Sequence, residues 1–119
     1  MRRLFSIVLL CCIMGCRGNE KPEEVLPPNK MENVIWDVVQ ADEFVQNFVL
    51  KDSNKIDVQA ERHRLYERVF KMHNTSWDQF VKSYQYYVAH PVQNKRIFDS
   101  LASRANRRIQ DAYKGMSSQ

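Results

Sequence analysis

The chain has 119 residues and carries 18 basic and 14 acidic side chains, which gives a formal net charge of +4. Arg2 and Arg3 lie in an N-terminal segment that we expect to be removed, and without them 16 basic side chains face 14 acidic ones. This near balance does not indicate a nucleic-acid partner, and three glycines in the whole chain leave no glycine-rich phosphate loop.

Residues 1–15 have the pattern of a secretory signal peptide. Two arginines precede an apolar run over residues 4–14, which is too short to cross a bilayer because a span needs roughly 20 apolar residues. The run leads into four residues that resemble a bacterial lipobox: Ile13-Met14-Gly15-Cys16. The pattern predicts acylation of Cys16, although Met14 is bulkier than usual at its position. The alternative is ordinary signal cleavage that leaves a free cysteine.

The cysteines support a lipid anchor. Cys11, Cys12 and Cys16 all lie in or at the end of the signal, so the mature domain has no disulfide, redox pair or cysteine metal site. Two or three acyl chains on Cys16 make a stable membrane anchor. We therefore expect a protein of the cell envelope, on the periplasmic face of a membrane or at the cell surface, with the outer membrane favoured.

The segment 16–28, which holds the lipidated cysteine, is predicted to be a flexible tether. It contains Gly18, three prolines and three glutamates, with few apolar side chains to bury. Leu26, just before the double proline, is the one residue here that we expect could dock on the domain.

The rest of the chain predicts an all-α fold, because no segment shows the alternation typical of strands. Short turns between the helices favour antiparallel neighbours, so we expect a small bundle of about four antiparallel helices over residues 29–114. Residues 115–119 are expected to fray. The predicted helices begin and end near Pro28 or Asn29 and Leu50, Ile56 and His73, Trp77 and Ala89, and Pro91 and Lys114.

The turn before the third helix is specified from both sides. Ser76 and Gln79 fit a capping box, in which each side chain bonds the backbone N–H of the other residue. Asn74 suits a left-handed C-cap of the preceding helix. Pro91 suits the first position of the last helix, where a missing N–H costs nothing.

Each helix has an apolar stripe that predicts its buried face. In the third helix we expect Phe80, Tyr84 and Tyr87 in the core and Tyr86 exposed. Ser83 should bond its own helix backbone or a neighbouring helix. An aromatic ligand platform is the alternative. In the first helix the stripe is Met31, Val34, Ile35, Val38, Val45, Phe48 and Val49, and in the last it is Ile97, Phe98, Leu101, Ala105, Ile109, Ala112 and Tyr113.

The most distinctive run is His73, Ser76, Phe80, Ser83, Tyr86, Tyr87 and Pro91. With Leu26-Pro27, Lys30-Met31, Val34, Ile35, Asp37 and Ala41 before it, and Ile97-Phe98 after it, this pattern resembles a family of small lipoproteins from Bacteroides-type bacteria that carries a helical domain of unknown function. The resemblance covers about Pro22 to Tyr113 and implies the fold and the envelope location. It implies no activity. The family usually has Gly and Ile where this chain has Asn74 and Thr75.

No constellation of residues predicts chemistry. His63, His73 and His90 match no zinc spacing, and the last two lie at helix ends, where a structural role is favoured. Asp37 is expected to pair with Arg104, Arg107 or Arg108, or with a tyrosine hydroxyl. No serine lies in a nucleophile elbow. We therefore expect no enzyme, no cofactor and no metal.

The leading hypothesis is a non-catalytic helical interaction module that binds another envelope protein. The alternative is a chaperone-like holdase or assembly factor for exported proteins, which a large apolar groove would favour and a uniformly polar surface would oppose. A DNA-binding helix-turn-helix is excluded because the helix after the turn has Lys82 as its one basic residue.

Overall fold

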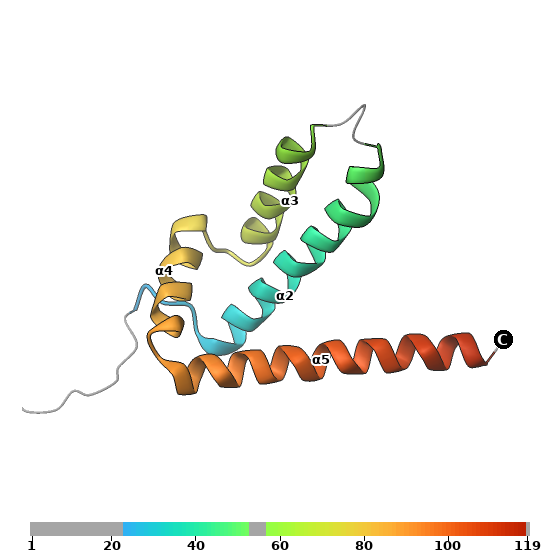
Figure 1. Cartoon of the computed structure of the whole chain (residues 1–119). Helices are drawn as coiled ribbons and strands as arrows, with labels where there is room; N and C mark the ends of the chain where they lie inside the picture. The colour runs from blue at the N-terminus through green and yellow to red at the C-terminus, as the bar shows by residue number, and fades with distance from the viewer. Residues whose placement is uncertain (1–22, 53–56, 119) are drawn as a thin grey trace, which may run out of the picture.

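The computed structural model describes residues 23–52 and 57–118, and within these ranges the chain is helical with no strand. The predicted all-α fold of four helices is confirmed (Figure 1). The helices are α2 (Pro28–Phe44), α3 (Val58–Met72), α4 (Trp77–Val88) and α5 (Pro91–Ser117). Two prolines begin helices as predicted, because Pro28 and Pro91 each occupy a position where the helix needs no N–H donor.

The helical path of α2 continues through a π-helical turn, Val45–Val49, and a 3₁₀ turn, Leu50–Asp52, to the end predicted for it. A π turn adds a residue and so shifts the face that later side chains occupy. Val45 and Val49 are buried, whereas Phe48 is exposed and stacks on Phe44 with ring centroids 5.2 Å apart. The prediction that Phe48 lies in the core is therefore wrong.

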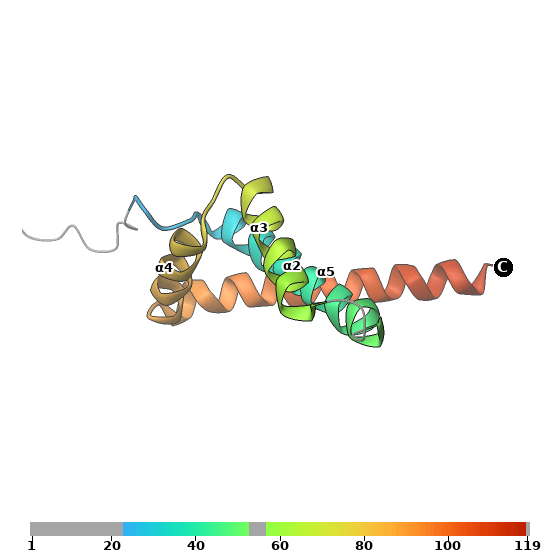
Figure 2. The same cartoon turned by 90° about the horizontal axis from the view of Figure 1, so that it is seen from above.

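The helices α2 and α3 form an antiparallel hairpin (Figure 1). Asp57 caps α3, because its side chain accepts from Gln59 N at 3.0 Å and from Ala60 N at 3.1 Å. Ile56, the expected start of this helix, lies outside the described residues. Viewed from above, α2 crosses α5, and the two helices diverge toward their C-terminal ends (Figure 2).

The core lies where α2, α3, α4 and the first half of α5 meet. Its buried side chains are Val25, Leu26, Met31, Val34, Val69, Phe70, Tyr87 and Ile97. Val25 and Leu26 belong to the segment that was predicted to be a tether, and Leu26 is only 1% exposed. The packed core therefore extends back to Val25, before the expected domain start at residue 29.

The last helix is longer and less covered than expected. It runs to Ser117, so residues 115–117 are helical where fraying was predicted; Gln119 lies outside the described residues. Every residue from Asn106 to Ser118 is exposed. Ile109, Ala112 and Tyr113 were expected in the core, but the divergence of α5 from α2 leaves them without a covering helix (Figures 1 and 2).

Candidate functional site

The turn between α3 and α4 is built as its residues require. Asn74 has a φ of 47°, the left-handed conformation that Asn tolerates better than most residues. The N–H of Thr75 donates to Phe70 O at 2.9 Å, and the N–H of Asn74 donates to Lys71 O at 3.1 Å. These two bonds form a Schellman motif, which ends α3 and reverses the chain. The predicted C-cap is confirmed.

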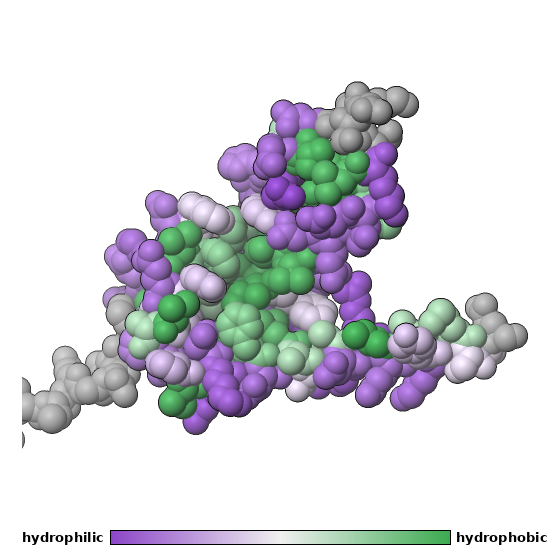
Figure 3. Space-filling view, viewed as in Figure 1, coloured by the Kyte–Doolittle hydropathy of each residue, from purple (hydrophilic) through white to green (hydrophobic). Residues whose placement is uncertain are grey.

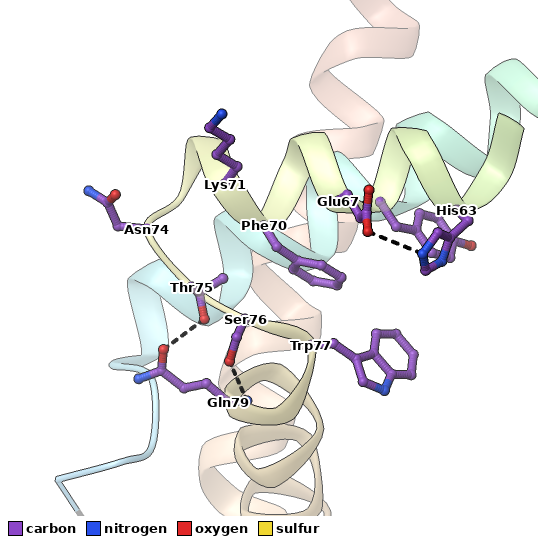
Figure 4. A pocket seen from close by; sticks show the side chains of 10 residues that line it. His63, Glu67, Phe70, Lys71, Asn74, Thr75, Ser76, Trp77 and Gln79 are labelled. Atoms are coloured by element: carbon purple, nitrogen blue, oxygen red, sulfur yellow. Dashed lines mark hydrogen bonds and ion pairs between the residues drawn. The ribbon is translucent and has the colours of Figure 1, made fainter. Parts of the chain in front are cut away.

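The start of α4 uses half of the expected capping box. Ser76 Oγ accepts from the N–H of Gln79 at 3.2 Å, as predicted. The side chain of Gln79 does not return to Ser76; its Oε1 accepts from Thr75 Oγ1 at 2.8 Å (Figure 4). The Gln79 side chain therefore bonds Thr75 in place of the Ser76 backbone.

A groove of about 840 Å³ opens between the second half of α3 and the first turn of α4. Phe70 forms part of its floor and is buried, while Trp77 stands beside it with 57% of its surface exposed (Figure 4). Their rings meet edge to face at a centroid distance of 5.9 Å. Phe80 continues the aromatic cluster, 5.4 Å from Phe70 and 6.2 Å from Trp77. The groove therefore combines a fixed floor with an exposed indole.

The rim of the groove is polar and carries both signs of charge. His63 and Glu67 face each other across one helical turn at 3.2 Å, and both are well exposed (Figure 4). Lys71 lies one turn further along α3. A ligand could thus bury apolar groups against the rings and place polar groups of either charge at the rim.

Sequence reasoning missed this site. Neither Trp77 nor the charged residues of α3 were among the predicted interaction residues. The available signal was the position of Trp77 directly after the cap Ser76, because side chains in the first turn of a helix often lie outside the packed face. Tyr84, also expected in the core, is exposed, since α4 buries only the side that carries Ser83 and Tyr87.

Ser83 and Tyr87 hold the backbone of Leu26 from both sides. The N–H of Leu26 donates to Ser83 Oγ at 2.9 Å, and the Tyr87 hydroxyl donates to Leu26 O at 2.7 Å. Ser83 Oγ also donates to Gln79 O at 2.6 Å, the bond within its own helix that was predicted. We call Leu26, Ser83 and Tyr87 the Leu26 clamp. Burial, with a smaller contribution from Tyr86, raises the pKa of Tyr87, so the hydroxyl stays a donor.

Tyr86 and Pro91 support the corner between α4 and α5. Tyr86 was expected to be exposed, but it is half-buried and stacks on His90, with ring centroids 3.9 Å apart. His90 Nδ1 lies 2.6 Å from Tyr86 O and donates to it. The His90 imidazole therefore satisfies a backbone carbonyl in the last turn of α4, which is a structural role. Pro91 follows as the exposed first residue of α5.

Asp37 pairs with His73 and not with an arginine or a tyrosine. The carboxylate lies 2.6 Å from His73 Nε2 and ties the middle of α2 to the end of α3. The expectation is wrong because consecutive helical residues differ by about 100° in direction. Asp37 faces α3, whereas its neighbour Trp36 faces α5 and lies under the Arg104 guanidinium at 4.4 Å.

A tyrosine hydroxyl instead reaches Asp42. Tyr66 donates to its carboxylate at 2.6 Å, and Arg62 lies 3.4 Å from the same oxygen. Burial first, and then the bond to Asp42, raises the pKa of Tyr66 to about 12 from its ordinary value of 10.0. The stability that this neutral phenol contributes is therefore complete below pH 10 and is lost as the pH rises toward 12.

The described part of the chain holds no group of three or more His, Cys, Asp or Glu side chains that could bind a metal ion. None of the helices between residues 23 and 118 combines the length and the apolar character that a membrane crossing requires. Cys16, the expected lipidation site, lies outside the described residues.

Comparison with known protein families gives a match over most of the chain. The model of a family described as "Domain of unknown function (DUF4296)" matches residues 22–111, which include the turn, the groove and the Leu26 clamp. No curated protein matches the chain. No solved structure matches it either.

Proposed function

The chain belongs to the DUF4296 family, whose description names no activity, and from its own surface we propose that it is a non-catalytic interaction module of the cell envelope. The groove between α3 and α4 carries the proposal. In this groove a half-exposed tryptophan stands over a fixed aromatic floor, the arrangement that anchors partner segments in protein interfaces.

The partner that suits this groove is a segment of another envelope protein with a large apolar or aromatic side chain. Such a side chain would pack between Phe70 and Trp77, and its flanking polar groups would meet Lys71 or Glu67 at the rim. The space-filling view supports this choice, because apolar surface gathers between α3 and α4 and is bordered by hydrophilic residues (Figure 3).

Replacing Trp77 by alanine should weaken partner binding by roughly 30-fold or more, since truncation of an interface tryptophan costs about 2 kcal/mol or more. The measurement is crosslinked capture from envelope extracts by the chain from Arg17 to Gln119, followed by titration of the protein recovered. Phe48→Ala is the matched control, because Phe48 is an exposed aromatic residue at the far end of the hairpin. Equal capture by the wild type and Trp77→Ala would overturn the proposal.

The second candidate function is a holdase for exported proteins. It is favoured by the number of apolar side chains exposed outside the groove, including the stacked pair Phe44 and Phe48. The same experiment separates the two functions. A holdase would capture many unrelated proteins and would lose capture with Phe48→Ala as well as with Trp77→Ala, whereas a specific module loses one partner with Trp77→Ala alone.

The envelope location rests on the signal and lipobox pattern before residue 17. Replacing Cys16 by alanine should release the protein from membranes and remove the mass of a diacylglycerol or more from the mature chain, because the acyl chains form the anchor. Membrane fractionation and intact-mass analysis of the two proteins measure this. A wild-type protein that is soluble and carries no lipid would contradict the anchor. Cys16 would then have a free thiol.

A further inference from the structure

One apolar stripe of α5 is largely exposed in the described part of the chain. It consists of Phe98, Ala102, Ala105, Ile109, Ala112 and Met116. These positions alternate in steps of four and three residues, the spacing of a coiled-coil seam. We call this set the α5 seam. Ile109 is 54% exposed and Met116 67% exposed, at positions where a coiled coil would bury them.

The seam is distinct from the face by which α5 joins its own domain. That second face carries the buried Ile97, Arg104 over Trp36, and Arg108, which donates to Gln40 at 3.0 Å. At about 100° per residue, the seam lies beside this face and not on it. In the space-filling view, apolar colour follows the protruding part of α5 along the side toward the hairpin, and hydrophilic colour follows the other side (Figure 3).

A helix that packs on the α5 seam would also contact residues of α2. Ala105, Ile109 and Ala112 line a hollow of about 320 Å³ between α5 and α2. The wall on the α2 side includes Trp36 and the exposed Val39. The seam and the hollow together make a trough for one additional helix.

We propose that the occupant of this trough is the α5 helix of a second copy of the chain, packed antiparallel to the first. The seam is self-complementary in that direction. When Phe98 lies opposite the second copy's Met116, Ala102 lies opposite Ala112 and Ala105 lies opposite Ile109, and two-fold symmetry repeats each pairing. Small alanines in the middle let the helices approach closely, and antiparallel helix dipoles attract.

The charges near the two-fold axis are compatible with this pairing. Arg108 would approach its counterpart, but each guanidinium is already engaged with its own α2, where Glu43 lies at 3.9 Å and Gln40 accepts a hydrogen bond. Asn106 offers a neutral amide on the other flank of the seam. The pairing extends over about 28 Å of helix. The interface is therefore small, and we expect a weak dimer whose population depends on the protein concentration.

The exposed half of α5 continues the helix from the packed half but gains little packing from its own chain. Residues 106–118 make no packing that buries a side chain, and a Cβ placed on Gly115 would meet no other atom within 4 Å. A second copy would supply the apolar contact that this half of α5 lacks within its own chain.

Sedimentation equilibrium of the chain from Arg17 to Gln119 tests the proposal. This chain keeps the whole core, which lies between Val25 and Leu101. Its mass should rise from one chain toward two across the micromolar range. Ile109→Asp should remain one chain throughout, whereas Gln110→Asp, which places the same charge about 100° further around α5 and outside the seam, should associate like the wild type. Circular dichroism verifies that both variants stay helical.

A second measurement tests which face of α5 forms the pairing. The chain from Arg17 has no cysteine, so Ala105→Cys introduces one thiol at the centre of the seam and Arg107→Cys one thiol on the opposite side. A short thiol-to-thiol crosslinker should join two Ala105→Cys chains and leave Arg107→Cys chains single. A wild type that stays one chain at all concentrations, or equal crosslinking of both cysteine variants, would overturn the proposal.

Discussion

Replacing Leu26 by alanine should lower the free energy of unfolding by about 3 kcal/mol, the cost typical of truncating a fully buried leucine. The side chain is 1% exposed and packs among Met31, Val34 and Tyr87, although it precedes the first helix. A domain of this size has roughly 5–13 kcal/mol of stability in total. The loss should appear as a lower denaturant midpoint in chemical unfolding followed by circular dichroism.

Leu50→Ala is the matched control for this prediction. Leu50 lies in the 3₁₀ turn after α2 and is 42% exposed, so the same truncation there should cost less than about 1 kcal/mol. Equal losses for the two variants would mean that Leu26 contributes no more than a surface leucine. The segment before α2 would then be a tether after all.

Removal of the Leu26 clamp should destabilise the domain by about 1–3 kcal/mol for each hydrogen bond. Tyr87→Phe leaves Leu26 O without its donor in a buried position, and Ser83→Ala leaves Leu26 N–H without its acceptor. Because both bonds fix one residue, the double variant should lose less than the sum of the single losses. A double-mutant cycle from denaturant unfolding measures this coupling.

Two controls isolate the clamp from general effects of the substitutions. Ser103→Ala removes a hydroxyl that makes the same type of bond to its own helix, to Asp99 O at 2.9 Å, but on the surface. Tyr113→Phe removes an exposed hydroxyl. Both should change the stability by less than about 0.5 kcal/mol. A loss for Tyr87→Phe no greater than that for Tyr113→Phe would contradict the clamp.

Local signals in the sequence predicted the helices and their ends well. Asn74, Ser76, Pro28 and Pro91 act through bonds or restrictions within a few residues, so their effect can be inferred without knowledge of the neighbouring helices. The all-α fold class followed from the same signals. Two ends deviate from the prediction: α2 gives way to a π-helical turn after Phe44, before the expected Leu50, and α5 runs on from the expected Lys114 to Ser117.

Features that depend on a neighbouring element were harder to predict. An apolar stripe shows which side chains could be buried but not whether another helix covers them, which is why Phe48 and Ile109 were placed in the core. The partner of Asp37 depends on how α2 is rotated between α3 and α5, and spacing alone does not give that rotation. Leu26 lies in an extended segment with no periodicity, so its burial left only a weak signal.

The groove was missed for a related reason. Its wall comes from α3 and its exposed indole from α4, and neither helix alone has an unusual pattern. The groove exists because the turn at Asn74 directs the first turn of α4 away from α3. Phe70 stays beneath the opening and forms its floor.

The Leu26 clamp also joins residues that are made far apart in time. Leu26 is made before its two partners, which follow 57 and 61 residues later. At about 5–20 residues per second, Tyr87 is added roughly 3–12 s after Leu26. During that interval Val25 and Leu26 have no site to enter, and α2 and α3 can pair only with one side of their core open. The first residues of the domain therefore gain their packing site only after α4 has been made.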